Sequence, residues 1–268
     1  MELAGYLASV LVGITLGLLG GGGSILTIPI LVYLFQLDVI TATAYSLFMV
    51  GATSLVGVVS KYRNGTVHFQ SVFLFGIPSL IAVFITRIWI VPSLPEVLLE
   101  APFTINKRLF LLGLFSVLMM VTAISMLMKK PGHAVTSPGQ LRLPAMSSLG
   151  LVVGFITGLV GAGGGFLIVP ALVMFARLPL PVAAGTSLFI IGINSSIGFV
   201  GDVLHSAIQW PFLLMLTTLA IAGVLMGNMM ATRISNQRLR QLFGWFILIM
   251  GCWILLREIE PGWLMISR

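Results

Sequence analysis

Two glycine-rich runs are the residues whose spacing most clearly suggests chemistry. The first is Gly20-Gly21-Gly22-Gly23-Ser24 and the second is Gly161-Ala162-Gly163-Gly164-Gly165. Consecutive glycines break a helix, and the apolar segment after each run predicts a short helix, roughly 24–36 and 165–176. A helix start offers unpaired N–H groups and about half a positive charge, and glycines let an anion approach closely. The runs therefore predict an anion site built from backbone, without a buried cation.

Polar side chains in the segment after each run could complete that site. Ser46 and Ser54 are eight residues apart, as are Ser187 and Ser195, so each pair shares a helix face. Asn194 adds an uncharged amide donor. The alternative role for these groups is hydrogen bonding between helices or to carbonyls of their own helix. The predicted anion-binding residues are Gly21, Gly22, Gly23, Ser24, Ser46, Ser54, Gly163, Gly164, Gly165, Ser187, Asn194 and Ser195.

Other chemistry finds little support in the sequence. The segment Gly17–Ser24 has a glycine where a phosphate-binding P-loop requires lysine, and no metalloprotease or serine-hydrolase motif occurs. His68, His205 and the single cysteine do not make a metal site. We therefore expect no enzyme activity, no cofactor and no metal. Tight helix packing is the alternative role for the glycines, and it is favoured for the pairs Gly13–Gly17 and Gly154–Gly158.

The composition places these residues in a membrane. Only 8% of the 268 residues are charged and 58% are apolar, whereas soluble domains carry roughly a quarter charged residues. A span needs about 20 apolar residues, and a β-barrel would show short alternating segments instead. The runs without Asp, Glu, Lys or Arg are 3–37, 39–60, 64–86, 109–128, 143–176, 178–201, 203–232 and 241–256. The sequence predicts an all-α polytopic membrane protein with no charged residue in the middle of a span, and polar connections at 88–108 and 129–142.

The two halves of the chain are repeats. The segment 12–59 aligns with 153–200 without a gap, with 20 identities in 48 positions. Near the end of each half, 106–109 aligns with 236–239. This offset is smaller than the one that aligns 12–59 with 153–200. The first half therefore carries an insertion, which we place within 88–105. The predicted units are a first transmembrane repeat (1–128), a cytoplasmic linker (129–142) and a second repeat (143–268). Such repeats are typical of secondary transporters.

The charges indicate how the repeats are oriented. If each glycine-broken run crossed the membrane once, lysines and arginines would divide seven against seven. If each run is instead a hairpin, one side of the membrane has nine lysines and arginines and the other has five. All seven acidic residues then lie on the side with five. We therefore predict inverted repeats, each a glycine-broken hairpin followed by three transmembrane helices, with both termini outside. The net charge of +7 then reports membrane orientation, and nucleic acid is not expected as a partner.

The doubled glycine pattern resembles a known family. Gly-Leu-x-Gly-x-Gly-Gly followed by Pro, at 17–29 and 158–170, is similar to the sulfite exporter family of the TauE/SafE type, also called toluene-sulfonate uptake permeases. The segment 63–69 (RNGTVHF) and the stretches 42–48 and 183–189 share this resemblance. The resemblance implies transport of small sulfur-containing anions such as sulfite, sulfonates, sulfoacetate or thiosulfate. Alternating access around a midplane site would carry them across the cytoplasmic membrane.

Two features depart from the family pattern. The 88–105 insertion alters the outer vestibule, and Ala162 stands where the first half has Gly21 and narrows the second break. The competing hypothesis is a membrane scaffold or partner subunit of the same fold that transports nothing. The expected partners are a small sulfur anion and the lipid of the inner membrane. The sequence leaves the oligomeric state open, a homodimer included.

Overall fold

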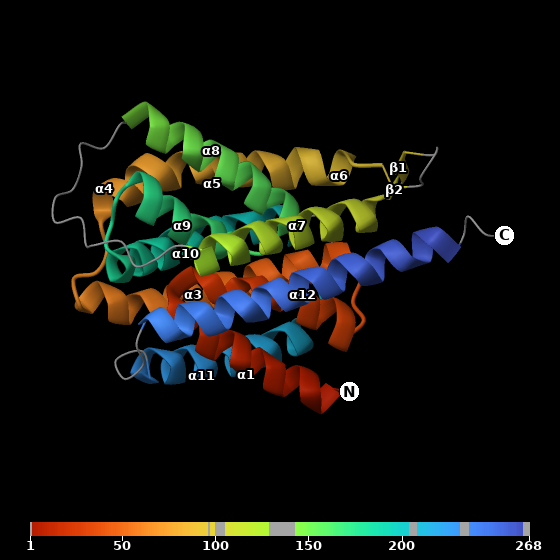
Figure 1. Cartoon of the computed structure of the whole chain (residues 1–268), viewed down its shortest axis with the longest axis horizontal. Coiled ribbons are helices and arrows are strands. Elements are labelled where there is room, and N and C mark those ends of the chain that lie inside the picture. Colours follow the sequence, from red (N-terminus) through yellow and green to blue (C-terminus); the bar gives the residue numbers. More distant parts are fainter. Residues whose placement is uncertain are drawn as a thin grey trace.

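The computed structural model of the chain describes residues 2–95, 97–99, 105–128, 143–203, 208–230 and 236–264. This part of the chain is nearly all helical (Figure 1). The segments long and apolar enough to cross a membrane are Ala4–Leu34, Val39–Arg63, Phe69–Ser93, Lys107–Ser125, Pro181–Val203 and Trp210–Met230. Two shorter apolar helices accompany them. The predicted linker 129–142 and His205 lie outside the described residues.

The first half contains a broken segment followed by three long helical segments. In chain order these are α1 (Glu2–Leu19), the 3₁₀ segment η1 (Gly20–Leu26), α2 (Thr27–Pro29), the π-helical η2 (Ile30–Leu34) and α3 (Val39–Arg63). The next segment is continuous and comprises α4 (Phe69–Ser71), η3 (Val72–Gly76), α5 (Ile77–Ile85), η4 (Thr86–Ile90) and α6 (Val91–Ser93), followed later by α7 (Lys107–Met128). Asp38 caps α3 by accepting a hydrogen bond from the Ile40 N–H at 3.0 Å.

The second half repeats this order with more regular helices. It comprises α8 (Leu143–Val160), α9 (Gly165–Phe175), α10 (Leu180–Val203), α11 (Trp210–Met230) and α12 (Asn236–Leu264). The segment α9 agrees closely with the short helix expected at 165–176. The first-half helix expected at 24–36 is instead divided into 3₁₀, α and π turns.

Two details of the first half differ from the expectation. The strands β1 (Val97–Leu99) and β2 (Ile105–Asn106) pair antiparallel, so the region of the predicted insertion contains a small β-hairpin in an otherwise helical protein. The helix before it runs on to Ser93, so the polar connection predicted to start at residue 88 begins later. The prediction was wrong here because it ended the span at the first charged residue, Arg87, which lies inside the helix.

The chain turns back on itself at the first glycine run. Tyr6, near the start of α1, packs against Phe35, just after η2, with ring centroids 5.6 Å apart. A side chain at Gly5 would collide with the same Phe35 ring. Figure 1 shows α9 running back toward the end at which α8 begins. In the same view the start of α1 and the end of α12 lie at one end of the molecule, and the start of α8 lies at the other.

Close glycine contacts hold the long helices together, and they recur in both halves. Gly13 of α1 lies against the backbone of Ala220 in α11, and Gly154 of α8 lies against the backbone of Ser79 in α5. A side chain at either glycine would collide with that backbone, so these glycines serve helix packing. The offset that aligns 12–59 with 153–200 relates Gly13 to Gly154 and Ser79 to Ala220, so the two contacts are equivalent.

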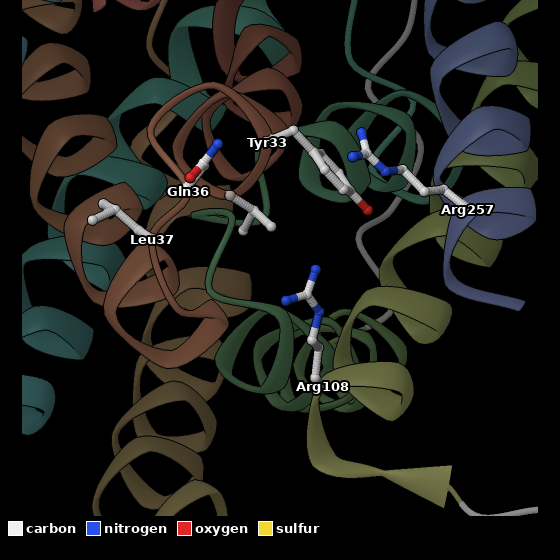
Figure 2. A pocket seen from close by; sticks show the side chains of 6 residues that line it. Tyr33, Gln36, Leu37, Arg108 and Arg257 are labelled. Atoms are coloured by element: carbon white, nitrogen blue, oxygen red, sulfur yellow. The ribbon is translucent and has the colours of Figure 1, made fainter. Parts of the chain in front are cut away.

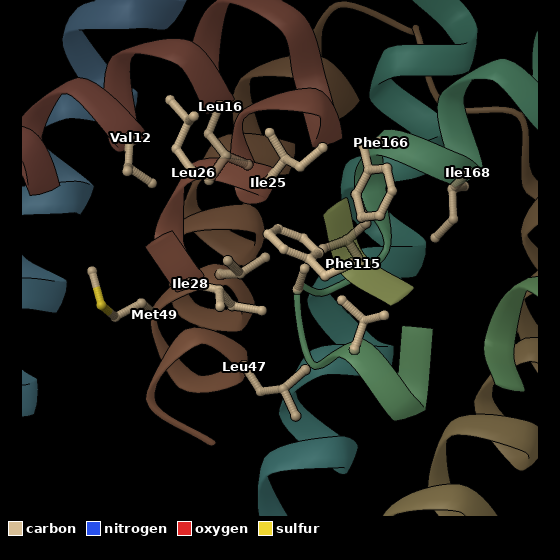
Figure 3. Packing of buried hydrophobic residues seen from close by; sticks show 14 of the residues in the cluster. Val12, Leu16, Ile25, Leu26, Ile28, Leu47, Met49, Phe115, Phe166 and Ile168 are labelled. Carbon is tan, nitrogen blue, oxygen red and sulfur yellow. The ribbon is translucent and has the colours of Figure 1, made fainter. Parts of the chain in front are cut away.

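The hydrophobic core joins the two broken segments. Ile25 and Ile28, from the first break, and Phe166, from the start of α9, are almost completely buried in one cluster (Figure 3). Phe115 of α7 packs edge-on against Phe166, with ring centroids 6.2 Å apart and an interplanar angle of 85°. This packing fixes the position of both glycine runs inside the protein.

Candidate functional site

The two glycine runs touch each other. A Cβ added at Gly21 of η1 would lie 2.6 Å from the Cα of Gly165, the first residue of α9, and one added at Gly165 would collide with the Gly21 backbone. The side chain of Ile191 in α10 lies against Gly21 at the same place. Only residues without side chains permit this approach, so the two glycine runs meet in the interior of the protein.

The two runs differ in backbone conformation. Gly20 and Gly161, which the repeat alignment pairs, both have left-handed φ, at 72° and 74°. Gly163 and Gly164 are also left-handed, at 66° and 70°, whereas their counterparts in the first run are not. The second run is therefore a true turn, from which α9 starts as a regular helix with Gly164 as its N-cap. The first run continues as a tight 3₁₀ coil, so only the second offers a regular helix start.

Three of the predicted serines are buried without a hydrogen-bond partner among the described residues. Ser54 of α3 and Ser195 of α10 are completely buried, and neither hydroxyl has a hydrogen-bond partner among the described residues. Ser195 lies beside the second run, since a Cβ at Gly163 would be 2.8 Å from its Oγ. Ser46 is likewise buried and unpaired within the described part of the chain. A buried hydroxyl without a partner costs free energy, so these groups are available to a ligand at no loss of existing bonds.

Three other predicted residues already form hydrogen bonds within the protein. The Ser24 hydroxyl donates to the Gly21 carbonyl at 2.9 Å, and the Ser187 hydroxyl donates to a carbonyl of its own helix at 2.9 Å. The Asn194 amide donates to Ser79 Oγ at 2.7 Å, which links α10 to α5. These bonds match the structural alternative that the sequence left open for such groups.

The remaining predicted glycines have separate surroundings. Gly22 is half-buried, and Gly23 lies against the backbone of Leu16 in α1. A side chain at Gly164 would collide with Thr157 of α8. The contacts of Gly23 and Gly164 hold each break against its preceding helix.

The sequence missed an arginine at the site. Arg87, within the segment 69–93, is only 1% exposed. Its Nη1 forms an ion pair with Asp202 Oδ2 of α10 at 2.9 Å and donates to Thr43 Oγ1 of α3 at 3.1 Å. The expectation of no buried cation was wrong, because the charges of two residues far apart in the chain neutralise each other here. One signal was present: both residues stand immediately after the end of an uncharged run.

Arg87 reaches the second glycine run. A side chain at Gly161 would collide with Arg87 Nη2 and with Thr43. The Nη2 and Nε groups of Arg87 are buried and have no hydrogen-bond partner among the described residues. The site thus combines backbone glycines, a helix start, an unpaired serine hydroxyl and one unpaired edge of a guanidinium.

A separate pocket of about 210 Å³ has none of the predicted anion-binding residues in its lining. Figure 2 shows the guanidiniums of Arg108 and Arg257 pointing into the space beside Tyr33. Arg257 lies over the Tyr33 ring, 5.1 Å from its centroid, and Arg108 Nη2 pairs with Glu258 at 3.1 Å. The lining residues are Val32, Tyr33, Gln36, Leu37, Arg108 and Arg257. Glu258 offsets the charge of Arg108, so the lining carries less net positive charge than its two arginines alone would give.

This architecture is that of a multi-pass helical membrane protein with two broken segments meeting in its interior. The chain belongs to the sulfite exporter TauE/SafE family, whose model matches residues 6–254. It is 30% identical over 254 residues to a "Probable membrane transporter protein" of Xylella fastidiosa, covering 92% of each chain. It is 25% identical to the "Probable membrane transporter protein YunE" of Bacillus subtilis, covering 90% of this chain and 93% of the relative. No solved structure matches it.

Proposed function

We propose that the protein moves small sulfur-containing anions across the cytoplasmic membrane and binds them where the two glycine runs meet. The family is one of membrane transporters, and its description names sulfite. Sulfite, sulfonates, sulfoacetate and thiosulfate share the negative charge and the small polar head that such a site would accept.

The observation that carries this proposal is the contact between the two runs, together with the unpaired donors beside it. Gly21 and Gly165 meet backbone to backbone, and the Ser195 hydroxyl, unpaired among the described residues, lies next to Gly163. A regular helix begins at the same point in α9. Backbone donors and a helix start stabilise an anion in a dry interior.

The proposed mechanism is alternating access by two inverted repeats. The repeat-related contacts of Gly13 and Gly154 support it, because each broken segment packs on a helix of the opposite half. Rocking one half against the other would then expose the meeting point to one side and then to the other. In this scheme both termini lie outside and the linker 129–142 lies inside.

Flux through the purified protein tests the proposal. Protein in liposomes should take up radiolabelled sulfite or a sulfonate, and Gly22→Leu should abolish that flux while thermal unfolding and chromatographic behaviour stay normal. Gly22 suits this test because the residue is half-buried and its right-handed backbone can accept a side chain without conformational strain. The matched control is Gly113→Leu on α7, where a new side chain meets nothing within 4 Å. Full flux in Gly22→Leu would exclude the site, and no flux of any sulfur anion through wild-type protein would favour the scaffold hypothesis.

The topology has a test of its own. Accessibility tags placed in the linker 129–142 and after the last helix should report opposite sides of the membrane. Tags on the same side would refute the hairpin arrangement and the inverted repeats with it.

A further inference from the structure

We infer that Arg87 binds the transported anion directly, through the paired N–H groups of its Nε and Nη2, and that the site favours a monoanion with two oxygens on one atom. This inference rests on the proposed function and names the ligand chemistry of the same site. A sulfonate and hydrogensulfite are anions of this kind.

The geometry divides the guanidinium into a used edge and an unpaired edge. Nη1 donates to Asp202 and to Thr43 Oγ1, at 2.9 and 3.1 Å. Nε and Nη2 are buried without a hydrogen-bond partner among the described residues. These two atoms form the side edge of the planar guanidinium, which matches two oxygens of one oxyanion by parallel hydrogen bonds. A buried arginine with this edge unpaired bears a desolvation cost that an oxyanion would remove.

The surroundings keep that edge at the second glycine run. Nη2 lies so close to Gly161 that any side chain there would collide with it. The left-handed backbone at Gly161, with φ of 74°, leads the chain directly into Gly163 and the start of α9. An anion on Arg87 would therefore lie at the turn that leads into this helix start.

The charges around Arg87 set the preferred charge of the ligand. Asp202 offsets the positive charge of Arg87, so this buried ion pair has no net charge. Among the described residues of this site, the remaining attraction comes from hydrogen bonds and from about half a positive charge at the start of α9. Such a site stabilises one negative charge better than two, because a second charge would be buried without compensation. Chloride carries one charge but cannot accept two parallel hydrogen bonds on separate atoms.

Binding of defined anions to purified protein tests the inference. Isothermal titration should show methanesulfonate binding at least tenfold more tightly than chloride and more tightly than sulfate. Arg87→Lys keeps the charge next to Asp202 but loses the paired edge, so we expect it to weaken methanesulfonate binding about tenfold or more. The control is Arg63→Lys, an exposed arginine at the end of α3, which should bind as wild type does.

A second variant guards against loss of folding in the first. The double change Arg87→Gln with Asp202→Asn replaces the ion pair by two neutral amides, and it removes both buried charges together. It should fold and should weaken methanesulfonate binding about tenfold or more.

The outcomes separate the inference from the proposed function. If wild-type protein transports sulfur anions but either folded variant binds methanesulfonate as wild type does, direct binding by Arg87 is refuted. Chloride or sulfate bound as tightly as methanesulfonate would refute the ligand class. If wild-type protein neither binds nor transports any sulfur anion, the proposed function fails and this inference fails with it.

Discussion

The two glycine runs occupy equivalent places in the two halves, yet they are built differently. Both begin with a left-handed glycine, Gly20 or Gly161. Only the second run continues with left-handed Gly163 and Gly164, and a regular helix then begins at Gly165. The difference shows that one sequence pattern yields either a tight coil or a turn, and that only the turn exposes a helix start.

The residue opposite each run differs in charge. The offset that aligns 12–59 with 153–200 also relates Arg87 to Asn228. Arg87 lies against Gly161 of the second run, whereas the Asn228 backbone lies against Gly17, just before the first run. The side-chain Nδ2 and Oδ1 of Asn228 also have no partner among the described residues. We infer that the second run carries most of the anion binding, since a cation and a helix start coincide there.

The largest expected contrast in stability is between removing the counter-charge of Arg87 and truncating Asn228. Asp202→Asn should lower the free energy of unfolding by about 3–5 kcal/mol, because it leaves the buried Arg87 without its counter-charge. Asn228→Ala should cost at most about 1 kcal/mol, since its amide makes no hydrogen bond to the described residues that would be lost. Chemical unfolding in detergent, followed by tryptophan fluorescence, compares the two. Equal losses would remove the distinction between the two runs.

A smaller contrast concerns the glycines themselves. Gly163→Ala should destabilise the protein by at least about 1–2 kcal/mol, because its φ of 66° is unfavourable for a residue with a side chain and the new Cβ would collide with Val50. Gly22→Ala occupies the corresponding position in right-handed backbone and should change stability by less than about 1 kcal/mol. Thermal melting of both purified variants measures the difference. A Gly22→Ala protein as unstable as Gly163→Ala would show that the conformational difference has no energetic consequence.

The smallest effect on stability is expected at the repeat-related serines. Ser54→Ala and Ser195→Ala each remove a buried hydroxyl that is unpaired among the described residues, so the free energy of unfolding should change by less than about 0.5 kcal/mol or rise. Anion affinity should fall about fivefold in Ser195→Ala, which loses a donor beside Gly163, and less in Ser54→Ala. Ser148→Ala, exposed on α8, is the control. A clear loss of stability together with unchanged affinity would assign Ser195 a purely structural role.

The sequence predicted those features of the fold that depend on local patterns. Uncharged runs located the long helices, and consecutive glycines located both breaks, since helix propensity is a local property. The start of α9 at Gly165 agrees with the expectation. The division of the first short helix into 3₁₀ and π turns was not predicted, because the same glycine pattern permits several backbone conformations.

The predicted site lacked its charged group for a physical reason. A hydropathy pattern ends a span at an isolated charge, so Arg87 was assigned to a connection. The charge is tolerated inside the helix because Asp202, which is distant in the chain, forms its ion pair. Asn194, in contrast, looked like a ligand donor in the sequence, whereas its amide bonds to Ser79 of a neighbouring helix. Which polar groups are left unpaired depends on packing between distant segments.

The most direct test of the central claim is an electron cryomicroscopy structure of the protein in lipid nanodiscs with saturating methanesulfonate. The account predicts density for the anion at the second glycine run, within hydrogen-bonding distance of Arg87 Nε and Nη2. Density only in the pocket between Arg108 and Arg257, in a preparation that transports the anion, would contradict it.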